Sequence, residues 1–265
     1  MPLDNPKTEN GRPTLTALLM NATVYPLIVA WTLLGILLFL PIFCLCKVLT
    51  GWDAGRITRY IIWLYGRGWI VIMRPFVRFR REGMENIPAA GPCILVVNHQ
   101  SFFDTYCMAM LPAHDIVFAV RSWPFRMFWY RQFMLLAEYL DVESHNWDET
   151  RMAARKVFDK QGMLLFFPEG HRSRNGELQR FYNGAFWLAA GEEVPIVPLC
   201  INGTDRLLPP KRWWLQPTEI VLRALPAINT CDHQESGDIR RLRKLVKQQL
   251  GSALKDIRKQ DTACN

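Results

Sequence analysis

The chain has 265 residues, half of them hydrophobic, and 32 Lys and Arg residues against 24 Asp and Glu residues give a net charge of +8. Such a chain can bury a full core, and one main domain with an appendage is expected. The seven cysteines are odd in number and mostly lie in apolar runs, which argues against a disulfide framework and indicates reduced thiols. The cysteines and the five histidines form no zinc-ligand pattern, so we expect no metal site.

The N-terminal region has the pattern of a membrane anchor. No charged residue occurs between Pro13 and Cys46, and residues 27–46 are almost wholly apolar, which is long enough to cross a bilayer or lie deep in it. The segment is longer than the hydrophobic region of a signal peptide. Pro26 and Pro41 can kink a helix here or break it into a re-entrant hairpin, so a full span and insertion into one leaflet both stay open.

Basic residues follow the apolar segment. Residues 47–81 carry eight Lys and Arg residues and the first twelve residues carry two, a bias that predicts a cytoplasmic main body. Residues 57–76 interleave apolar side chains with Arg59, Arg67 and Arg74, which is typical of an interfacial helix whose arginines extend toward the membrane surface. A core helix packed against the first segment is the alternative. We predict an anchor over residues 1–79 and a second domain over residues 80–265.

Beyond the anchor, short apolar runs alternate with helical patterns. Strands are predicted at residues 94–97, 116–120, 163–167, 196–201 and 220–224, and helices at 102–110, 125–137, 149–160, 183–190 and 238–257. The last of these helices is amphipathic, with one apolar and one basic face. The alternation predicts an α/β domain in which helices flank a mostly parallel sheet.

His99 and Asp104 form the first candidate site. The apolar run before Asn98 predicts a buried strand that ends at His99, on the carboxyl edge of the sheet, where open α/β folds gather their chemistry. Histidine suits a base near neutral pH, and a carboxylate can hold it in place. The two side chains meet only if the chain bends between them, and Ser101 predicts this bend as a helix start. The same residues also fit a plain helix cap without chemistry.

A second apolar run, residues 163–167, also predicts a buried strand that ends abruptly at polar residues. It is followed by Pro168, Glu169, Gly170 and Arg172. A rigid proline, an acid, a permissive glycine and an arginine at the end of a strand make a candidate cradle for phosphate or carboxylate. An exposed charged loop is the alternative, and two strands that end in this way make it the weaker one.

Three blocks of sequence carry a resemblance to a known family. In chain order they are Asn98-His99-x4-Asp104, Phe167-Pro168-Glu169-Gly170-x-Arg172-Ser173 and Val194-Pro195-Ile196-Val197-Pro198. In content, order and spacing they resemble the motifs of the PlsC-type glycerolipid acyltransferases, the 1-acylglycerol-3-phosphate acyltransferase family. The resemblance covers about residues 80–227, and members of this family commonly dock to membranes through N-terminal apolar helices.

The resemblance implies a reaction and a catalytic pair. A fatty acyl group would pass from acyl-CoA or acyl-acyl carrier protein, the co-substrate, to a hydroxyl of a lyso-lipid, without a cofactor. His99 would be the general base, and Asp104 would hold its imidazole. The chemistry agrees, because a thioester is already activated and its direct attack needs no protein nucleophile or metal.

The resemblance also implies a substrate-binding set. Glu169, Gly170 and Arg172 occupy the acceptor-binding block, where the arginine would pair with a phosphate. The other members are Arg121, where the family often has Lys or Arg, and Pro195 and Pro198, which would shape the acyl pocket. Between the first two of these blocks the family has another, which usually holds an arginine. This chain has Val142 there, so a zwitterionic or amino-acid lyso-lipid stays open beside lysophosphatidic acid.

The expected partners follow from the anchor and the reaction. Residues 125–131 and 211–214 mix aromatic and basic side chains, which indicates contact with a membrane, and the anchor argues against nucleic acid as a partner. We expect a lipid bilayer, a lyso-lipid acceptor and an acyl-CoA or acyl carrier protein donor, at the cytoplasmic face of a membrane such as the bacterial inner membrane. A catalytically idle lipid-binding scaffold and a thioesterase or lipid hydrolase are the alternative functions.

Overall fold

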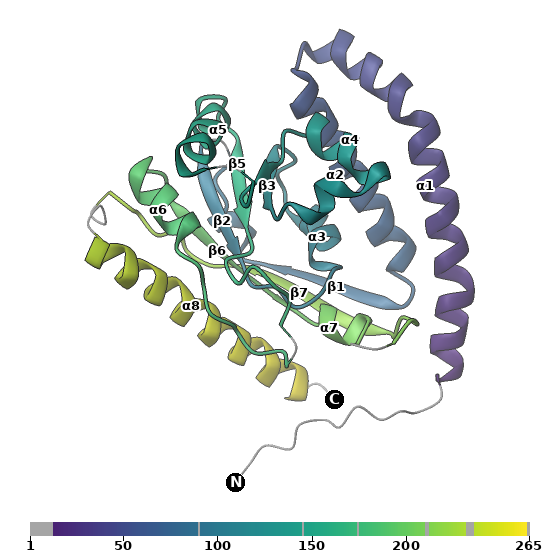
Figure 1. Cartoon of the computed structure of the whole chain (residues 1–265). Coiled ribbons are helices and arrows are strands. Elements are labelled where there is room, and N and C mark those ends of the chain that lie inside the picture. Colours follow the sequence, from purple (N-terminus) through teal and green to yellow (C-terminus); the bar gives the residue numbers. More distant parts are fainter. Residues whose placement is uncertain are drawn as a thin grey trace.

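The computed structural model describes residues 13–89, 91–144, 146–173, 175–209, 212–231 and 236–263 (Figure 1). Two helices come first in this part of the chain, α1 (Leu15–Thr50) and α2 (Ala54–Met73). The strands are β1 (Val77–Glu82), β2 (Cys93–Val97), β3 (Ile116–Val120), β4 (Leu140–Asp141), β5 (Met163–Phe166), β6 (Ile196–Asn202) and β7 (Thr218–Ala224). The other helices are α3 (Asp104–Cys107), α4 (Phe128–Leu136), α5 (Trp147–Asp159), α6 (Gly184–Gly191), α7 (Thr204–Leu207) and α8 (Ser236–Ala263), with 3-10 turns η1 (Met84–Asn86), η2 (Met108–Met110) and η3 (Trp123–Arg126).

In the described residues the strands form one sheet in the order β1-β7-β6-β2-β5-β3-β4. All pairings are parallel except that of β6 with β7, which confirms the predicted mostly parallel α/β fold. The sequence pattern did not predict β1 or the two-residue β4. Both are edge strands, and β1 is polar and partly exposed, so it lacks the apolar run that marks a central strand.

Strand β2 is apolar throughout because both faces of the sheet are covered. Ile94 and Val96 pack in one core, with side chains of α5, α6 and α8, and Cys93, Leu95 and Val97 pack in the other, with side chains of α1 and α2. Figure 1 shows these two helical layers on opposite sides of the sheet. Alternate residues of one strand therefore serve two cores, as expected for a buried parallel strand.

Helix α1 continues through Pro26 and Pro41 without a break. By length and composition it is the helix of the described chain that could cross a membrane. Its beginning is docked on the α/β domain, because the Asn21 side chain exchanges two hydrogen bonds of 2.9 and 2.8 Å with the backbone of Leu215. Farther along, large apolar side chains are exposed, with Leu37 at 72%. This surface indicates membrane association.

Helix α2 is a core helix, so the expectation of an interfacial helix with exposed arginines is wrong for Arg59. The Arg59 side chain is 3% exposed, its Nε lies 2.7 Å from Asp115 Oδ1, and its guanidinium donates to the carbonyl of Ala137. Trp69 on the same helix is also buried. The carboxylate that neutralises Arg59 stands 56 residues away, so the local pattern did not reveal it. The first twelve residues, with their two basic residues, lie outside the described residues.

The Arg59–Asp115 pair gives a prediction about stability. Replacing Arg59 by Ala leaves Asp115 without its closest cation and should lower the free energy of unfolding by about 3 kcal/mol. Arg67→Ala is the matched control, because Arg67 is an exposed arginine of the same helix. Denaturant titration of both variants in detergent micelles tests this, and equal losses of stability would show that Arg59 is not a core residue.

Candidate active site

Three strand ends meet at one edge of the sheet. Strand β2 lies between β5 and β6 and is parallel to both, with Val96 opposite Phe166 and Val97 opposite Leu199. The loops that follow these strands therefore start side by side. They carry the first two motif blocks of the sequence and the segment after β6, which brings residues 70 to 100 positions apart into contact.

His99 and Asp104 lie in direct contact. His99 Nδ1 is 2.7 Å from Asp104 Oδ2, and the same oxygen accepts the backbone N–H groups of Gln100 at 2.6 Å and Ser101 at 2.8 Å. A carboxylate that accepts from several N–H groups leaves Nδ1 as the donor, so Nε2 is the basic nitrogen of the neutral ring. The His99 ring stacks on Phe167 at 4.3 Å between centroids and stays partly exposed, whereas Asp104 is fully buried.

The bend between these two residues differs in detail from the prediction. The predicted helix over residues 102–110 starts at Asp104 and changes to a 3-10 turn after Cys107. The Asp104 N–H donates to the Ser101 carbonyl, not to its hydroxyl, so Ser101 is not the side-chain cap of this helix. The Asp104 carboxylate reaches back to the turn as a cap would, and it binds His99 at the same time. Both expected roles of this carboxylate therefore coexist.

Glu169 is buried beneath His99. One of its oxygens accepts the His99 N–H at 2.9 Å, and the other accepts the Gln179 N–H at 2.7 Å. Burial raises the pKa of Glu169, and the two N–H donors oppose that rise. In this arrangement both oxygens are used by the backbone, so the side chain braces the two loops and offers no oxygen to a substrate.

Gly170 has a backbone role. Its φ of +68° lies in the left-handed region, and a Cβ there would approach the Tyr182 ring to 3.0 Å. A glycine is therefore needed for the turn after Glu169. The same loop is fixed to the pair of His99 and Asp104, hereafter the dyad, because the Ser173 N–H donates to the His99 carbonyl at 2.8 Å.

A basic group lies at the end of β3, beside the loop that follows β5. Arg121 Nε is 2.5 Å from Glu143 Oε1, and its guanidinium donates to His171 Nε2 at 2.5 Å. Glu143 also accepts the Ser122 N–H, and this bond and Arg121 lower the pKa of its carboxyl. Arg172 is exposed and forms no ion pair with another described residue. Val142, which stands where the resembled family usually has an arginine, is exposed next to Glu143.

The two prolines of the third block lie in the sheet. Pro198 is in β6 opposite Val96, and its carbonyl accepts the Leu225 N–H. Pro195 precedes β6, and its carbonyl accepts the Ile94 N–H near the start of β2. Because β2 and β6 are parallel, Pro195 lies at the edge of the sheet opposite His99. Pro195 is therefore not brought to the dyad, whereas Pro198 is in register with Val96, three residues before His99.

The structure adds residues to this edge that the sequence pattern did not single out. The Thr204 hydroxyl donates to Asp104 Oδ1, and Glu143 and His171 contact Arg121. A polar residue two positions after the end of β6 was the available signal for Thr204. Two further basic residues lie outside the described residues. They are Arg174, which follows the second motif block, and Lys211 of the predicted membrane-contact segment 211–214.

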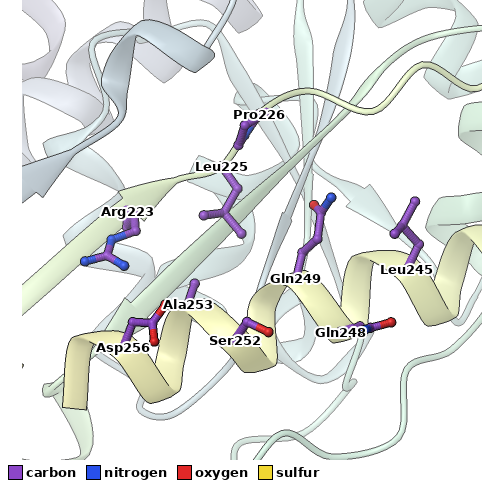
Figure 2. A pocket seen from close by; sticks show the side chains of 9 residues that line it. All are labelled: Arg223, Leu225, Pro226, Leu245, Gln248, Gln249, Ser252, Ala253 and Asp256. Atoms are coloured by element: carbon purple, nitrogen blue, oxygen red, sulfur yellow. The ribbon is translucent and has the colours of Figure 1, made fainter. Parts of the chain in front are cut away.

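A separate hollow of about 430 Å³ lies between β7 and α8 (Figure 2). Arg223, which lines this hollow, forms a salt bridge with Glu82. The backbone N–H of Leu225, another lining residue, donates to the Pro198 carbonyl. Strand β7 runs antiparallel to β6, so the end of β7 that lines this hollow lies toward the start of β6. The hollow is therefore away from the edge of the sheet that carries His99. In the described part of the chain no cluster of three or more His, Cys, Asp and Glu could hold a metal ion.

Comparisons with known proteins agree on the family. Residues 78–202 match the family model described as Acyltransferase. The chain is 32% identical over 139 residues to the chloroplastic 1-acyl-sn-glycerol-3-phosphate acyltransferase BAT2 of Brassica napus, an alignment that covers 51% of this chain and 40% of the relative. It is 27% identical over 173 residues to the human 1-acyl-sn-glycerol-3-phosphate acyltransferase beta, covering 62% and 61%.

The fold also has a match among solved structures. The PlsC crystal structure from Thermotoga maritima, described as a 1-acyl-sn-glycerophosphate acyltransferase, superposes with a TM-score of 0.73 at 21% identity and covers 93% of this chain and 98% of that one. The chain spans about two fifths of the length of the first curated plant relatives that it matches. The match to the Acyltransferase family model over residues 78–202 includes His99, Asp104 and Glu169.

Proposed function

We propose that the protein transfers a fatty acyl group from a thioester, acyl-CoA or acyl-acyl carrier protein, to the hydroxyl of a lyso-glycerophospholipid. The carrying observation is the 2.7 Å contact of His99 with the buried Asp104, which leaves Nε2 of a partly exposed imidazole as the base. The names of the relatives support 1-acylglycerol-3-phosphate as the acceptor.

The proposed mechanism needs one base and no covalent intermediate with the protein. His99 Nε2 takes the proton of the acceptor hydroxyl as its oxygen attacks the thioester carbonyl carbon. The C–S bond then breaks, and the imidazolium returns the proton to the leaving thiolate. Asp104 stabilises the imidazolium and fixes the tautomer, while Glu169 holds the His99 backbone in place.

The acceptor's phosphate is proposed to bind at Arg121, His171 and Arg172. Arg121 and His171 already lie in contact, and the loop that carries both His171 and Arg172 is bonded to the His99 carbonyl through Ser173. Arg121 is paired with Glu143, so a phosphate must compete with this carboxylate. The valine at position 142 removes one family cation, and His171 adds an imidazole in contact with Arg121.

The proposed membrane contact is the exposed apolar surface of α1. The start of this helix is bonded to the loop before β7 through Asn21 and Tyr25, and α2 packs along its later part, where Trp31 Nε1 donates to the Tyr65 carbonyl. A helix flanked by its own domain over this length fits insertion into one leaflet better than a free span. We propose that this surface lies on the cytoplasmic face of the membrane.

The first prediction concerns the base. His99→Ala should lower acyl transfer from acyl-CoA to lysophosphatidic acid by about 10² to 10⁴-fold, because no other group replaces Nε2. His114→Ala, which changes a half-buried histidine packed on Trp52 and Tyr60, is the control and should retain activity. Mass spectrometry of the lipids is the readout. Turnover that survives His99→Ala contradicts the mechanism, and free fatty acid without acylated lipid assigns a hydrolase.

The second prediction concerns the acceptor. Arg121→Ala should raise KM for lysophosphatidic acid about tenfold with little change in kcat, because it removes a charged partner of the phosphate. Glu143→Gln should lower the same KM, because it releases Arg121 from an ionised competitor. Arg240→Ala, at an exposed arginine of α8, is the control. Steady-state kinetics with lysophosphatidic acid and a zwitterionic lyso-lipid measure both effects, and an unchanged KM in both variants assigns Arg121 no contact with the headgroup.

The third prediction concerns the membrane. Leu37→Asp combined with Leu40→Asp should weaken binding of the full chain to phosphatidylglycerol-containing vesicles by about 100-fold or more, because two exposed leucines lose their place in the lipid. Leu245→Asp on α8 is the matched control, since this leucine is also exposed but faces another side. Vesicle flotation measures the binding, and equal flotation of the double variant and the control rejects α1 as the membrane contact.

A further inference from the structure

The second oxygen of Asp104 has a partner of its own. Asp104 Oδ2 is shared by His99 Nδ1 and two backbone N–H groups, whereas Oδ1 accepts the Thr204 hydroxyl. Asp104 and Thr204 are both fully buried. A buried carboxylate oxygen without a donor is costly, so this hydroxyl is a significant part of the carboxylate's environment.

Thr204 is held there by the end of β6. The Asn98 side chain exchanges two hydrogen bonds, of 2.9 and 2.8 Å, with the backbone of Ile201, and Gln100 Oε1 accepts the Gly203 N–H at 3.2 Å. With the Thr204–Asp104 bond, three side chains of the first motif block thus bind the segment after β6. The ends of β2 and β6 are joined by these contacts.

Gly203 makes the position of Thr204 possible. Its φ is +99°, and a Cβ at this position would lie 2.0 Å from the backbone oxygen of Glu219 in β7. The chain turns sharply here and enters α7 with Thr204 directed at Asp104. The threonine is therefore placed by a rigid backbone and has little freedom to leave the carboxylate.

We propose that Thr204 is a positioning residue of the His99–Asp104 dyad, which fixes the rotation of the Asp104 carboxylate so that Oδ2 faces His99 Nδ1. The inference rests on the proposed acyl transfer for its kinetic consequence. Without the hydroxyl, Oδ1 is bare, and the carboxylate is free to tilt out of the plane in which it binds the imidazole. His99 then loses its fixed orientation toward the acceptor hydroxyl.

The groups that titrate around this pair are few. Glu169 accepts the His99 N–H from the loop after β5, and Cys107 of α3 faces Asp104 and stays a neutral thiol because burial raises its pKa. Glu169 is the other carboxyl group that acts on the dyad electrostatically. Loss of the Thr204 hydroxyl changes both the hydrogen bonding of the carboxylate and its alignment with the imidazole, so the titration of the pair as a unit should shift.

The kinetic test compares three substitutions. Thr204→Val should lower kcat about 10 to 100-fold with little change in KM and shift the acid limb of the pH–rate profile. Thr204→Ser keeps the hydroxyl and should restore most of the activity. Thr230→Val is the matched control, because Thr230 is also fully buried and its hydroxyl donates to the carbonyls of Ala189 and Val194, away from the dyad.

A second measurement does not depend on acyl transfer. Nuclear magnetic resonance of the histidine side chains, with His99→Ala for assignment, should show that the imidazole titration of His99 shifts in Thr204→Val and stays in place in Thr204→Ser and Thr230→Val. If the valine variant does not fold, Thr204→Ala takes its place in both measurements. An unmoved titration, or a kcat no lower than in Thr230→Val, overturns the proposal; a wild-type protein without acyl transfer overturns the proposed function and leaves the resonance test to decide on Thr204.

Discussion

The buried carboxylate of Asp104 is the constraint on which this edge of the structure depends. Taking a carboxylate out of water is expensive unless donors replace the lost hydration. Asp104 obtains donors from three places: the imidazole of His99, the backbone of its own turn and the hydroxyl of Thr204. The turn between β2 and α3 and the turn after β6 must therefore close together on one group, and the base is fixed as part of that closure.

A second carboxylate extends the same logic to the third strand end. Glu169 accepts one N–H from the turn after β2 and another from Gln179 in its own loop. Three strands that end at one edge would otherwise leave backbone N–H groups of their loops unpaired below the surface. Asp104 and Glu169 pair them, so the charges of the two motif blocks stabilise the loops at the same time as they set up the His99 site.

The local parts of this design can be predicted from sequence, and the long-range parts cannot. The sheet class, its central strands and the His99–Asp104 contact follow from apolar runs and from two residues five positions apart. The contacts of Arg59 with Asp115 and of Asp104 with Thr204 join positions 56 and 100 residues apart, and no periodicity encodes such pairs. Glu169 illustrates another limit of prediction from sequence. Its place in a motif is visible in the sequence, but only the folded chain shows that both of its oxygens bind backbone N–H groups.

The charge arrangement beside the dyad bears on what the site accepts. The Arg121 guanidinium donates to the Glu143 carboxylate and to His171 Nε2. Its positive charge is therefore neutralised by a carboxylate of the same chain. A phosphate that displaces Glu143 exchanges one charge-assisted bond for another, and the net gain comes from its second negative charge. A zwitterionic headgroup offers less of this gain. An acceptor with an anionic monoester headgroup therefore fits the proposed reaction better than a zwitterionic one, with Val142 at the position where the resembled family usually has an arginine.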